Sequence, residues 1–301
     1  MGTNEKENAL SGHQGALYDA AWNATTQEWV TAGGDGVVAK WPFQDPNAGQ
    51  AVLHHEKAFF CVCVTTDGLV AGTEDGELFF FNTSEETKRW TAHRGGVFSL
   101  LQHENGRIYS GGGDGRILEW TSGQLTGEWS LAKPAKIRTL VAQGGNIFVG
   151  SSNGEGRIWN PNESMDLAVA PAMGFHEGGL YAALFLDSKN VWVTGGRDGH
   201  LRVWNSAGES VMNIPAHEGA IYRMQRTADK IWTASRDKTV KCWSASTLQP
   251  LSKWTHRNGG CRRSVNALII GGPKNEWLLA GGDDRLGRVV QWDALSPVDG
   301  L

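Results

Sequence analysis

Histidine and aspartate recur along this chain, and both side chains can transfer protons or hold metal ions. The chain has nine histidines, and an acidic residue follows most of them at a similar distance. A catalytic pair, however, needs two groups that converge on one point. The aspartates instead occupy one register in successive segments, so each is expected to face its own histidine. This pattern favours a repeated structural role over a shared active site.

The sequence has no P-loop or HExxH pattern, and its GxSxG match, GSSNG at 150–154, falls on an expected hairpin turn and not on a strand-to-helix elbow. The glycine-rich stretch GGGDGR at 111–116 lies between two expected strands and does not open a helix, which indicates a hairpin turn and not a phosphate site. The cysteines at positions 61, 63, 242 and 261 form no CxxC pair. We therefore expect no enzyme activity, no catalytic residue, no cofactor and no metal.

The elements that must position these residues form a repeat. Tyr109–Trp120 reads YSGGGDGRILEW, and Val193–Asn205 reads VTGGRDGHLRVWN. Repetition at a period of about 40 residues indicates a repeat architecture. The aligned turn and aromatic residues are Asp35/Trp41, Asp75/Phe81, Asp114/Trp120, Asn153/Trp159, Asp198/Trp204, Asp237/Trp243 and Asp283/Trp292. In the seventh repeat, DDRLGR is expected to lengthen the turn by three residues.

Within each repeat the pattern is that of strands. Segments such as GALYDAAW and GGVFSLLQ alternate or run apolar and then meet a turn, and DG between apolar runs is a strong hairpin signal. The sequence therefore predicts an all-β, seven-bladed β-propeller of four-stranded antiparallel blades, as a single domain over residues 1–301. The N-terminal segment ENALSGH is expected to add a strand that closes the last blade.

The pattern GH…[ST]xxxD…W resembles the WD40 repeat family over the whole chain, and GHQG at 12–15 and QWD at 291–293 match its signature. The resemblance implies a buried hydrogen-bond chain of histidine, serine or threonine, aspartate and tryptophan. This structural network is assigned to His13–Thr31–Asp35–Trp41, His93–Ser110–Asp114–Trp120, His176–Thr194–Asp198–Trp204 and His217–Thr233–Asp237–Trp243.

Three repeats depart from that network and are expected to depend more on packing against their neighbours. Phe81 in the second repeat cannot donate the indole hydrogen bond. Lys133 and Val149 replace the histidine and the threonine of the fourth repeat. Leu279 interrupts the seventh repeat, in which His256 is placed at the histidine position.

The resemblance also implies a "top" face, where the histidine loops and aspartate turns open and where partners dock. Two sets of residues are assigned to this partner-binding face. An aromatic collar consists of Tyr18, Phe60, Phe98, Tyr181 and Tyr222, and a basic arc consists of Lys136, Arg138, Arg197, Arg236, Arg262 and Arg263. Aromatic residues are enriched at binding hot spots. Both sets also have a structural interpretation, in which the rings pack between blades and the charges form a solvated surface.

The function that the sequence favours is a non-catalytic scaffold that binds a protein or peptide partner, acidic or phosphorylated, as a subunit of a larger complex. A nucleic-acid-binding propeller is one alternative, which the net charge of −4 disfavours. The other is a propeller enzyme or small-ligand binder that uses the central channel. The N-terminal residues have no apolar signal-peptide region, and the longest apolar runs are shorter than a membrane span. We expect a cytoplasmic protein with reduced cysteines.

Overall fold

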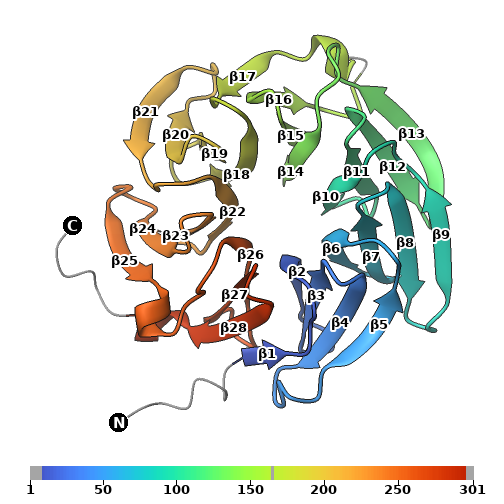
Figure 1. Ribbon diagram of the computed structural model, residues 1–301. Helices are drawn as coiled ribbons and strands as arrows, with labels where there is room; N and C mark the ends of the chain where they lie inside the picture. Colours follow the sequence, from blue (N-terminus) through green and yellow to red (C-terminus); the bar gives the residue numbers. More distant parts are fainter. Residues whose placement is uncertain (1–8, 164–165, 296–301) are drawn as a thin grey trace. The chain divides into compact units, whose positions relative to one another are not determined.

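Seven antiparallel sheets of four strands each make up the chain in the computed structural model, which describes residues 9–163 and 166–295 (Figure 1). The prediction of an all-β fold with seven four-stranded blades is confirmed. Contacts within the chain divide it into two compact units. The first unit comprises Met1–Phe59 with Tyr222–Leu301, and the second comprises Phe60–Ile221.

The second unit contains four successive sheets, and the first strand of one sheet contacts the first strand of the next, as β10 contacts β14 and β14 contacts β18. The strands are β6 (Phe59–Thr65), β7 (Gly68–Thr73), β8 (Glu77–Asn82) and β9 (Thr87–Thr91); β10 (Val97–Gln102), β11 (Ile108–Gly112), β12 (Arg116–Thr121) and β13 (Gln124–Ser130); β14 (Ile137–Gln143), β15 (Asn146–Ser151), β16 (Glu155–Trp159) and β17 (Ala172–Phe175); β18 (Leu180–Leu186), β19 (Val191–Gly196), β20 (His200–Trp204) and β21 (Ser210–Pro215).

The first unit contains the other three sheets. Their strands are β2 (Leu17–Asn23), β3 (Glu28–Gly33), β4 (Val37–Pro42) and β5 (Gln50–His54); β22 (Ile221–Arg226), β23 (Lys230–Ser235), β24 (Val240–Ser244) and β25 (Pro250–Trp254); β26 (Val265–Gly271), β27 (Trp277–Gly282), β28 (Leu286–Gln291) and β1 (Ala9–Ser11). β1 pairs antiparallel with β28, with Ala9 opposite Arg288. The predicted closure of the last blade by an N-terminal strand is therefore confirmed.

Hairpin turns follow from their glycine and aspartate residues. In the first repeat, Gly36 has a φ of 73°, a conformation that favours glycine. A Cβ atom at this position would also collide with the carbonyl oxygen of His55. The amide of Gly36 donates to the carbonyl of Gly33 at 3.3 Å and closes the turn between β3 and β4. The turn thereby places Asp35 at the end of the hairpin.

The prediction for the turn of the seventh repeat is wrong. Arg285 N–H donates to the carbonyl of Gly282 at 3.1 Å, as Gly36 does to Gly33, so this turn is as short as that of the first repeat. Asp284, and not Asp283, therefore corresponds to Asp35. The alignment failed because two aspartates are adjacent and because Trp292 lies just beyond β28.

This shift of one residue also moves the partners of that turn. Val290 takes the strand position that Trp41 has in the first repeat, and it lies opposite Leu278. Ala280, and not Leu279, takes the threonine position. The indole of Trp292 instead donates to the carbonyl of Asn275 at 3.0 Å.

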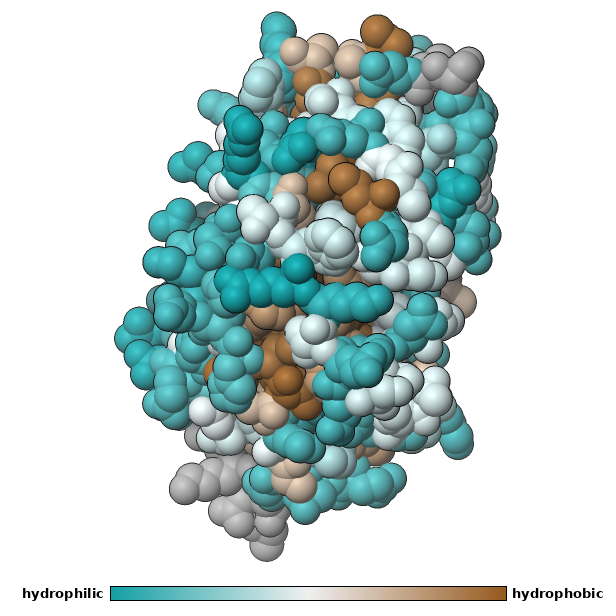
Figure 2. Space-filling model, turned by 90° about the vertical axis from the view of Figure 1, so that its right-hand side faces the viewer, coloured by the Kyte–Doolittle hydropathy of each residue, from teal (hydrophilic) through white to brown (hydrophobic). Residues whose placement is uncertain are grey.

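Apolar side chains fill the spaces between successive sheets. In the second unit, Tyr109 meets the ring of Trp159 edge-on, with centroids 6.4 Å apart, and Phe148 packs on Trp192 at 4.7 Å. In the side view of Figure 2, hydrophilic residues cover most of the surface and apolar residues form small separate groups. The apolar residues of each repeat are thus used mainly for packing between sheets.

Helical structure in the described part of the chain is limited to the short 3-10 helices η1 (Leu167–Val169), η2 (His256–Asn258) and η3 (Trp292–Ala294). Across residues 9–163 and 166–295, we find no helix with the length and apolar character that a bilayer crossing requires. Residues 1–8, on which the expectation about a signal peptide partly depends, lie outside the described residues.

Candidate functional site

In three repeats, a buried hydrogen-bond chain ties the loop before the first strand to the following hairpin. In the first repeat, His13 Nδ1 lies 2.9 Å from an oxygen of Asp35, and His13 Nε2 lies 2.8 Å from Thr31 Oγ1. The indole N–H of Trp41 donates to the same hydroxyl at 2.8 Å. Since the carboxylate only accepts, Nδ1 carries the histidine proton and Nε2 accepts from the threonine. Both ring nitrogens of His13 are therefore hydrogen-bonded.

The same chain occurs twice in the second unit. In the third repeat, His93 contacts Asp114 at 3.0 Å and Ser110 at 2.8 Å, and Trp120 donates to Ser110 at 3.0 Å. In the fifth repeat the corresponding distances are 2.9, 2.8 and 2.8 Å, for His176–Asp198, His176–Thr194 and Trp204–Thr194. These residues are saturated by one another, which leaves them a structural role.

The sixth repeat contains part of this chain within the first unit. The indole of Trp243 donates to Thr233 Oγ1 at 3.0 Å. The turn residue Asp237 accepts from Thr239, whose hydroxyl lies at 2.6 Å and whose amide lies at 3.0 Å. His217, the fourth residue assigned to this network, belongs to the second unit and is buried.

The aspartates of the complete hydrogen-bond chains have lowered pKa values in the folded protein. Burial raises the pKa of Asp114, but the backbone amide of Arg94, the His93 pair and the Arg116 guanidinium outweigh it and bring the pKa to about 2. The pKa of Asp198 is also lowered to about 2, because the bonds from His176 and Arg202 outweigh burial. Burial lowers the pKa of His93 and of His176. Each pair therefore consists of a carboxylate and a neutral imidazole.

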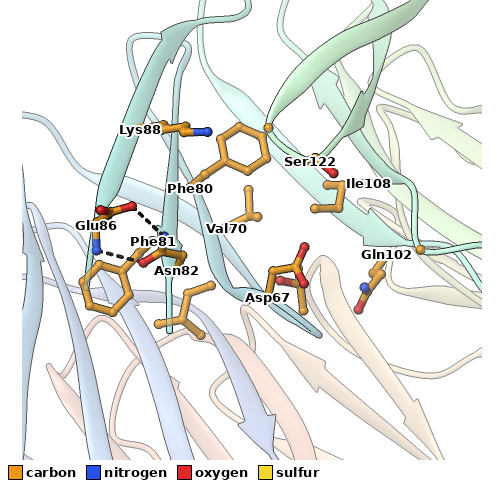
Figure 3. Close-up of a pocket in the computed structure, with 14 residues that line it drawn as sticks. Asp67, Val70, Phe80, Phe81, Asn82, Glu86, Lys88, Gln102, Ile108 and Ser122 are labelled. Carbon is orange, nitrogen blue, oxygen red and sulfur yellow. Dashed lines mark hydrogen bonds between the residues drawn. The ribbon is translucent and has the colours of Figure 1, made fainter. Parts of the chain in front are cut away.

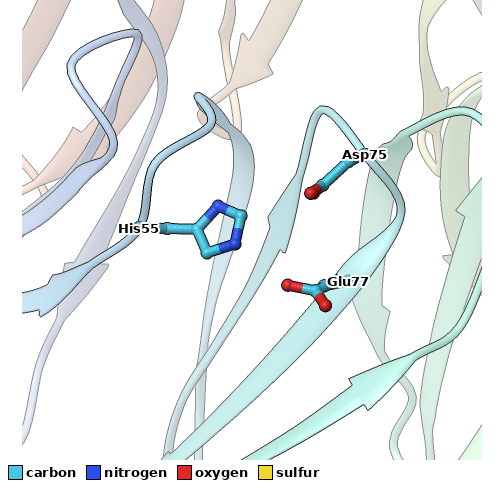
Figure 4. A group of neighbouring side chains, drawn as sticks. All are labelled: His55, Asp75 and Glu77. Carbon is cyan, nitrogen blue, oxygen red and sulfur yellow. The ribbon is translucent and has the colours of Figure 1, made fainter.

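Two repeats of the second unit lack the chain and hold the turn differently. In the second repeat the Thr73 hydroxyl donates to Asp75 at 2.5 Å, and in the fourth Ser151 makes the corresponding bond to Asn153. Glu77, two residues after Asp75, pairs with the guanidinium of Arg89. Figure 4 shows the carboxylates of Asp75 and Glu77 on their hairpin, together with His55, which follows β5. A hydroxyl within the hairpin thus bonds the turn residue in both repeats.

In each repeat, we consider the residue five positions after the place that histidine has in the hydrogen-bond chain. This residue lies at the start of the first strand of a sheet, beside the loops and turns. We call this end of the sheets the loop end. The opposite end, where the first strand of each sheet turns into the second, is called the hairpin end. In the second unit the four residues at this position are Phe60, Phe98, Arg138 and Tyr181. All four are half-buried.

These four side chains form one continuous stack, which we call the aromatic–arginine row. The rings of Phe60 and Phe98 are stacked, with centroids 5.4 Å apart and an interplanar angle of 21°. The guanidinium carbon of Arg138 lies 4.6 Å from the Phe98 centroid and 4.8 Å from the Tyr181 centroid. Lys136 Nζ lies 5.3 Å from the same Phe98 ring. Such cation–π contacts are attractive within about 6 Å.

Glycines give the end of the row its shape. A Cβ atom on Gly179 would lie 2.7 Å from the ring of Tyr181, and one on Gly178 would lie 2.9 Å from the side chain of Arg197. The backbone amide of Arg197 donates to the carbonyl of Gly179 at 2.9 Å, and its side chain is exposed. The structure therefore brings Lys136, Arg138 and Arg197 to the loop end of the second unit, as three cations beside the aromatic rings.

The first unit holds the remaining predicted residues. Tyr18 and Tyr222 are half-buried, and Arg236, Arg262 and Arg263 are exposed. These arginines share their loop end with carboxylates, so the predicted basic arc is not purely basic there.

Two acidic residues at this loop end were not among the predicted partner-binding residues. Asp283, which was predicted as the turn aspartate, occupies the position before it, and its Oδ1 accepts from Asn266 Nδ2 at 2.8 Å. Asp19 pairs with Arg223 at 3.2 Å. The adjacent pair Asp283–Asp284 was the sequence signal for the first of them.

Cys261, and not His256, occupies the histidine position of the seventh repeat. The amide of the next residue, Arg262, donates to Asp284 Oδ2 at 2.8 Å, just as Gln14 N–H donates to Asp35. Arg288 donates to the same oxygen of Asp284 at 2.7 Å. Burial raises the pKa of the Cys261 thiol to about 12. The prediction for His256 is wrong because this residue lies in the preceding helix η2.

Comparison with known families finds three matches to the family model for WD40, described as WD domain, G-beta repeat. They cover residues 84–121, 173–205 and 208–244. The chain is 27% identical over 113 residues to nuclear distribution protein nudF 2 of Penicillium rubens, which covers 35% of this chain and 21% of that protein. It is 25% identical over 118 residues to the U5 small nuclear ribonucleoprotein 40 kDa protein of Dictyostelium discoideum, covering 38% of this chain and 32% of that one.

A third relative and one solved structure extend these similarities. Ribosome biogenesis protein ytm1 of Neosartorya fischeri is 31% identical over 110 residues, covering 32% of this chain and 22% of that protein. The matched regions thus span a third or less of the length of each of these relatives. The crystal structure of the computationally designed Ika8 protein aligns with a TM-score of 0.68 at 20% identity, covering 94% of this chain and 98% of that one. This last likeness concerns the fold.

Proposed function

We propose that this chain, which is a WD40-repeat protein, is a non-catalytic scaffold that binds a segment of a partner protein at its loop end. The observation that carries the proposal is the aromatic–arginine row. Histidine, aspartate and tryptophan are used up in the buried chains, whereas the row repeats along four successive sheets without serving those chains. Half-buried aromatic and arginine side chains are the residue types that dominate binding energy at interfaces.

The charges of the row favour an acidic or phosphorylated segment. Lys136 and Arg138 are both held within about 5 Å of the Phe98 ring, so two like charges are placed close together. A carboxylate or phosphate at this point would relieve their repulsion and accept charge-assisted hydrogen bonds. Arg197 supplies a third cation at the next sheet. The rings would then orient Arg138 rather than receive an apolar side chain of the partner.

The same stack weighs against the nucleic-acid alternative. Single-stranded nucleic acids stack their bases on exposed aromatic faces. Phe98 instead has Phe60 on the side of the preceding sheet and Arg138 on the side of the following one. A base would have to displace one of these contacts. The net charge of −4 also opposes binding to a polyanion.

The relatives support a role in an assembly. One of them is named as a protein of a small nuclear ribonucleoprotein, and WD40 repeats are what this chain shares with it. We infer that this chain is also a subunit of a larger complex, and that it is cytoplasmic. All four cysteines lie in the described part of the chain, and no disulfide joins them, which is compatible with a reducing compartment.

An affinity pulldown from lysate of the source organism, read by mass spectrometry, tests the proposal. The double variant Arg138→Ala/Arg197→Ala is compared with wild type, and the exposed Lys189→Ala at the hairpin end serves as the matched control. We expect partners that wild type and the control retain and the double variant loses, and their binding should weaken as salt is raised. Partners kept equally by all three proteins would refute a binding surface at the loop end.

A further inference from the structure

A cavity of about 260 Å³ lies between the second and third sheets, at the hairpin end, opposite to the aromatic–arginine row (Figure 3). One side is formed by β7, β8 and β9, and the other by β11 and by the turns after β10 and β12. It lies wholly within the second unit. We call it the β7–β11 pocket.

A small side chain borders the pocket at a position where the next two sheets carry aromatic rings. Val70 of β7 lies five residues before the turn residue of its hairpin, and Tyr109 of β11 and Phe148 of β15 hold the same position in the next two sheets. Tyr109 and Phe148 fill the space to the following sheet with an aromatic ring, against Trp159 and Trp192. Valine, which also holds this position as Val193 in the fifth repeat, has no ring. Val70 therefore leaves more room between the second and third sheets than an aromatic residue would.

The floor of the pocket is apolar. Val70 and Ile108 face it from the two sheets, with Phe80 beside them, as Figure 3 shows. Val70 is 2% exposed and Ile108 is 8% exposed, so the packed sheets hold both in place. The ring of Phe80 rests on Trp120, with centroids 5.5 Å apart. An apolar group that entered would lose its contact with water without displacing any of these side chains.

The rim of the pocket carries more negative than positive charge. Asp67 and Glu86 line it, together with a single cation, Lys88. The neighbouring turns add the exposed carboxylates of Glu85 and Glu104. The nearby guanidinium of Arg107 is engaged with Glu119 at 3.0 Å. A ligand that crosses this rim is therefore favoured if it carries positive charge.

Size decides between a small molecule and a side chain. Pockets for small molecules usually measure about 300–1,000 Å³, and this pocket is smaller and open at the sheet end. We propose that the β7–β11 pocket binds a single aliphatic side chain, of the size of leucine or methionine, from a partner segment that carries lysine or arginine beside it. This is a second docking point, with a charge preference opposite to that of the loop end, and it does not depend on the proposed function of the row.

Methyl NMR on the intact chain tests this proposal. The probes are three capped tripeptides, Arg-Leu-Arg, Arg-Ala-Arg and Glu-Leu-Glu. We expect the methyl signals of Ile108 and Val70 to shift saturably with Arg-Leu-Arg. Arg-Ala-Arg should bind roughly tenfold more weakly, because it lacks the buried leucine methyls. Glu-Leu-Glu should also bind several-fold more weakly, because of the rim.

Two variants and one control complete the test. Val70→Phe fills the pocket with the residue type that the protein uses at Phe148, and it should abolish the Ile108 shift while the melting temperature stays the same or rises. Asp67→Lys changes only an exposed turn residue and should reduce the preference for the Arg peptide over the Glu peptide. Lys189→Ala, at the hairpin end of another sheet, should leave all peptide binding unchanged.

The results that would overturn the proposal are equally specific. They are an absence of shifts with every peptide, undiminished binding by a folded Val70→Phe variant, or equal binding of the Arg and Glu peptides. If Val70→Phe does not fold, Asp67→Lys decides: an unchanged peptide preference refutes the pocket. Loss of binding by Lys189→Ala would place the peptide outside the pocket.

Discussion

Single buried polar residues in this protein satisfy the hydrogen bonds of several neighbours at once. Ser110 accepts the indole hydrogen bond of Trp120 and donates to His93, and it is fully buried. The second repeat shows what happens when such a chain is given up, since it replaces the hydroxyl with Ala71 and the tryptophan with Phe81 together. Paired loss leaves fewer buried polar groups unsatisfied than single loss.

Substitution of Ser110 alone is therefore expected to be costly. Ser110→Ala leaves the His93 and Trp120 nitrogens without their partner and should lower the free energy of unfolding by about 2–4 kcal/mol. In Ser110→Ala/Trp120→Phe, the loss should be smaller than the sum of the two single losses, because the Trp120 donor is removed with its acceptor. Urea denaturation of the four proteins measures the coupling. Strictly additive losses would contradict the hydrogen-bond account.

At the scale of elements, the pairing of β1 with β28 joins segments from the two ends of the sequence. Leu10 of β1 is 1% exposed and packs in the same cluster as Leu279 and Ala267. Without β1, strand β28 would present an unpaired edge, which is a liability for any sheet. The seventh sheet is therefore expected to depend on three residues far away in sequence.

Removal of β1 tests that dependence. Deletion of residues 1–11 should lower the free energy of unfolding by about 3 kcal/mol, of which burial of Leu10 accounts for about 2 kcal/mol. Deletion of residues 1–8 alone is the matched control and should leave stability nearly unchanged. A synthetic peptide with the sequence of residues 7–13 should raise the melting temperature of the shorter protein. Equal stability of the two truncated proteins would show that β1 contributes nothing.

The sequence carried most of this architecture but not all of it. The turn aspartate and the strand aromatic recur at fixed distances, so the hairpins of the first six repeats could be aligned by eye. The seventh could not, because Asp283 and Asp284 are adjacent and Trp292 lies past the end of its strand. The β7–β11 pocket could not be predicted from the sequence either, because its volume depends on how the side chains of two sheets pack beside Val70.

The candidate site was predictable to a similar degree. The position of each row residue followed from the repeat, and the structure brings Phe60, Phe98 and Tyr181 together with Arg138. Whether rings in successive repeats stack or stand apart depends on side-chain rotamers, which the sequence does not contain. The only sign in the sequence that Arg138 lies between two rings is its place at a position that is aromatic in the other three repeats of the second unit.

At the scale of the whole molecule, the buried chains make stability sensitive to acid. The pKa values of Asp114 and Asp198 fall from the ordinary 3.8 to about 2 on folding. As the pH falls, the unfolded protein therefore binds protons at these aspartates before the folded protein does. The stabilisation is present above about pH 4 and is lost as the pH falls towards 2. Burial lowers the pKa of His93 and His176 below the ordinary 6.5, which adds a loss in the same direction, beginning below pH 6.5.

Stability should consequently decrease steadily on acidification. Each aspartate contributes up to about 2 kcal/mol, reduced where solvent reaches the carboxylate. Urea denaturation at pH 7.5, 6, 4.5 and 3 measures the slope. In Asp198→Asn the protein should be less stable at neutral pH and should lose less on acidification than wild type. Stability that rose between pH 6 and pH 4.5 would be incompatible with neutral buried histidines.

The pairing of β1 with β28 also imposes an order on biosynthesis. β1 leaves the ribosome before β28, which follows about 280 residues later. At roughly 5–20 residues per second, β1 has no partner strand for on the order of 15–60 s. During that interval its apolar Leu10 is available to chaperones and to the unpaired edges of other nascent chains. The last sheet can be completed only after β28 has been synthesised, so a ribosome stalled before that point would leave the first unit open.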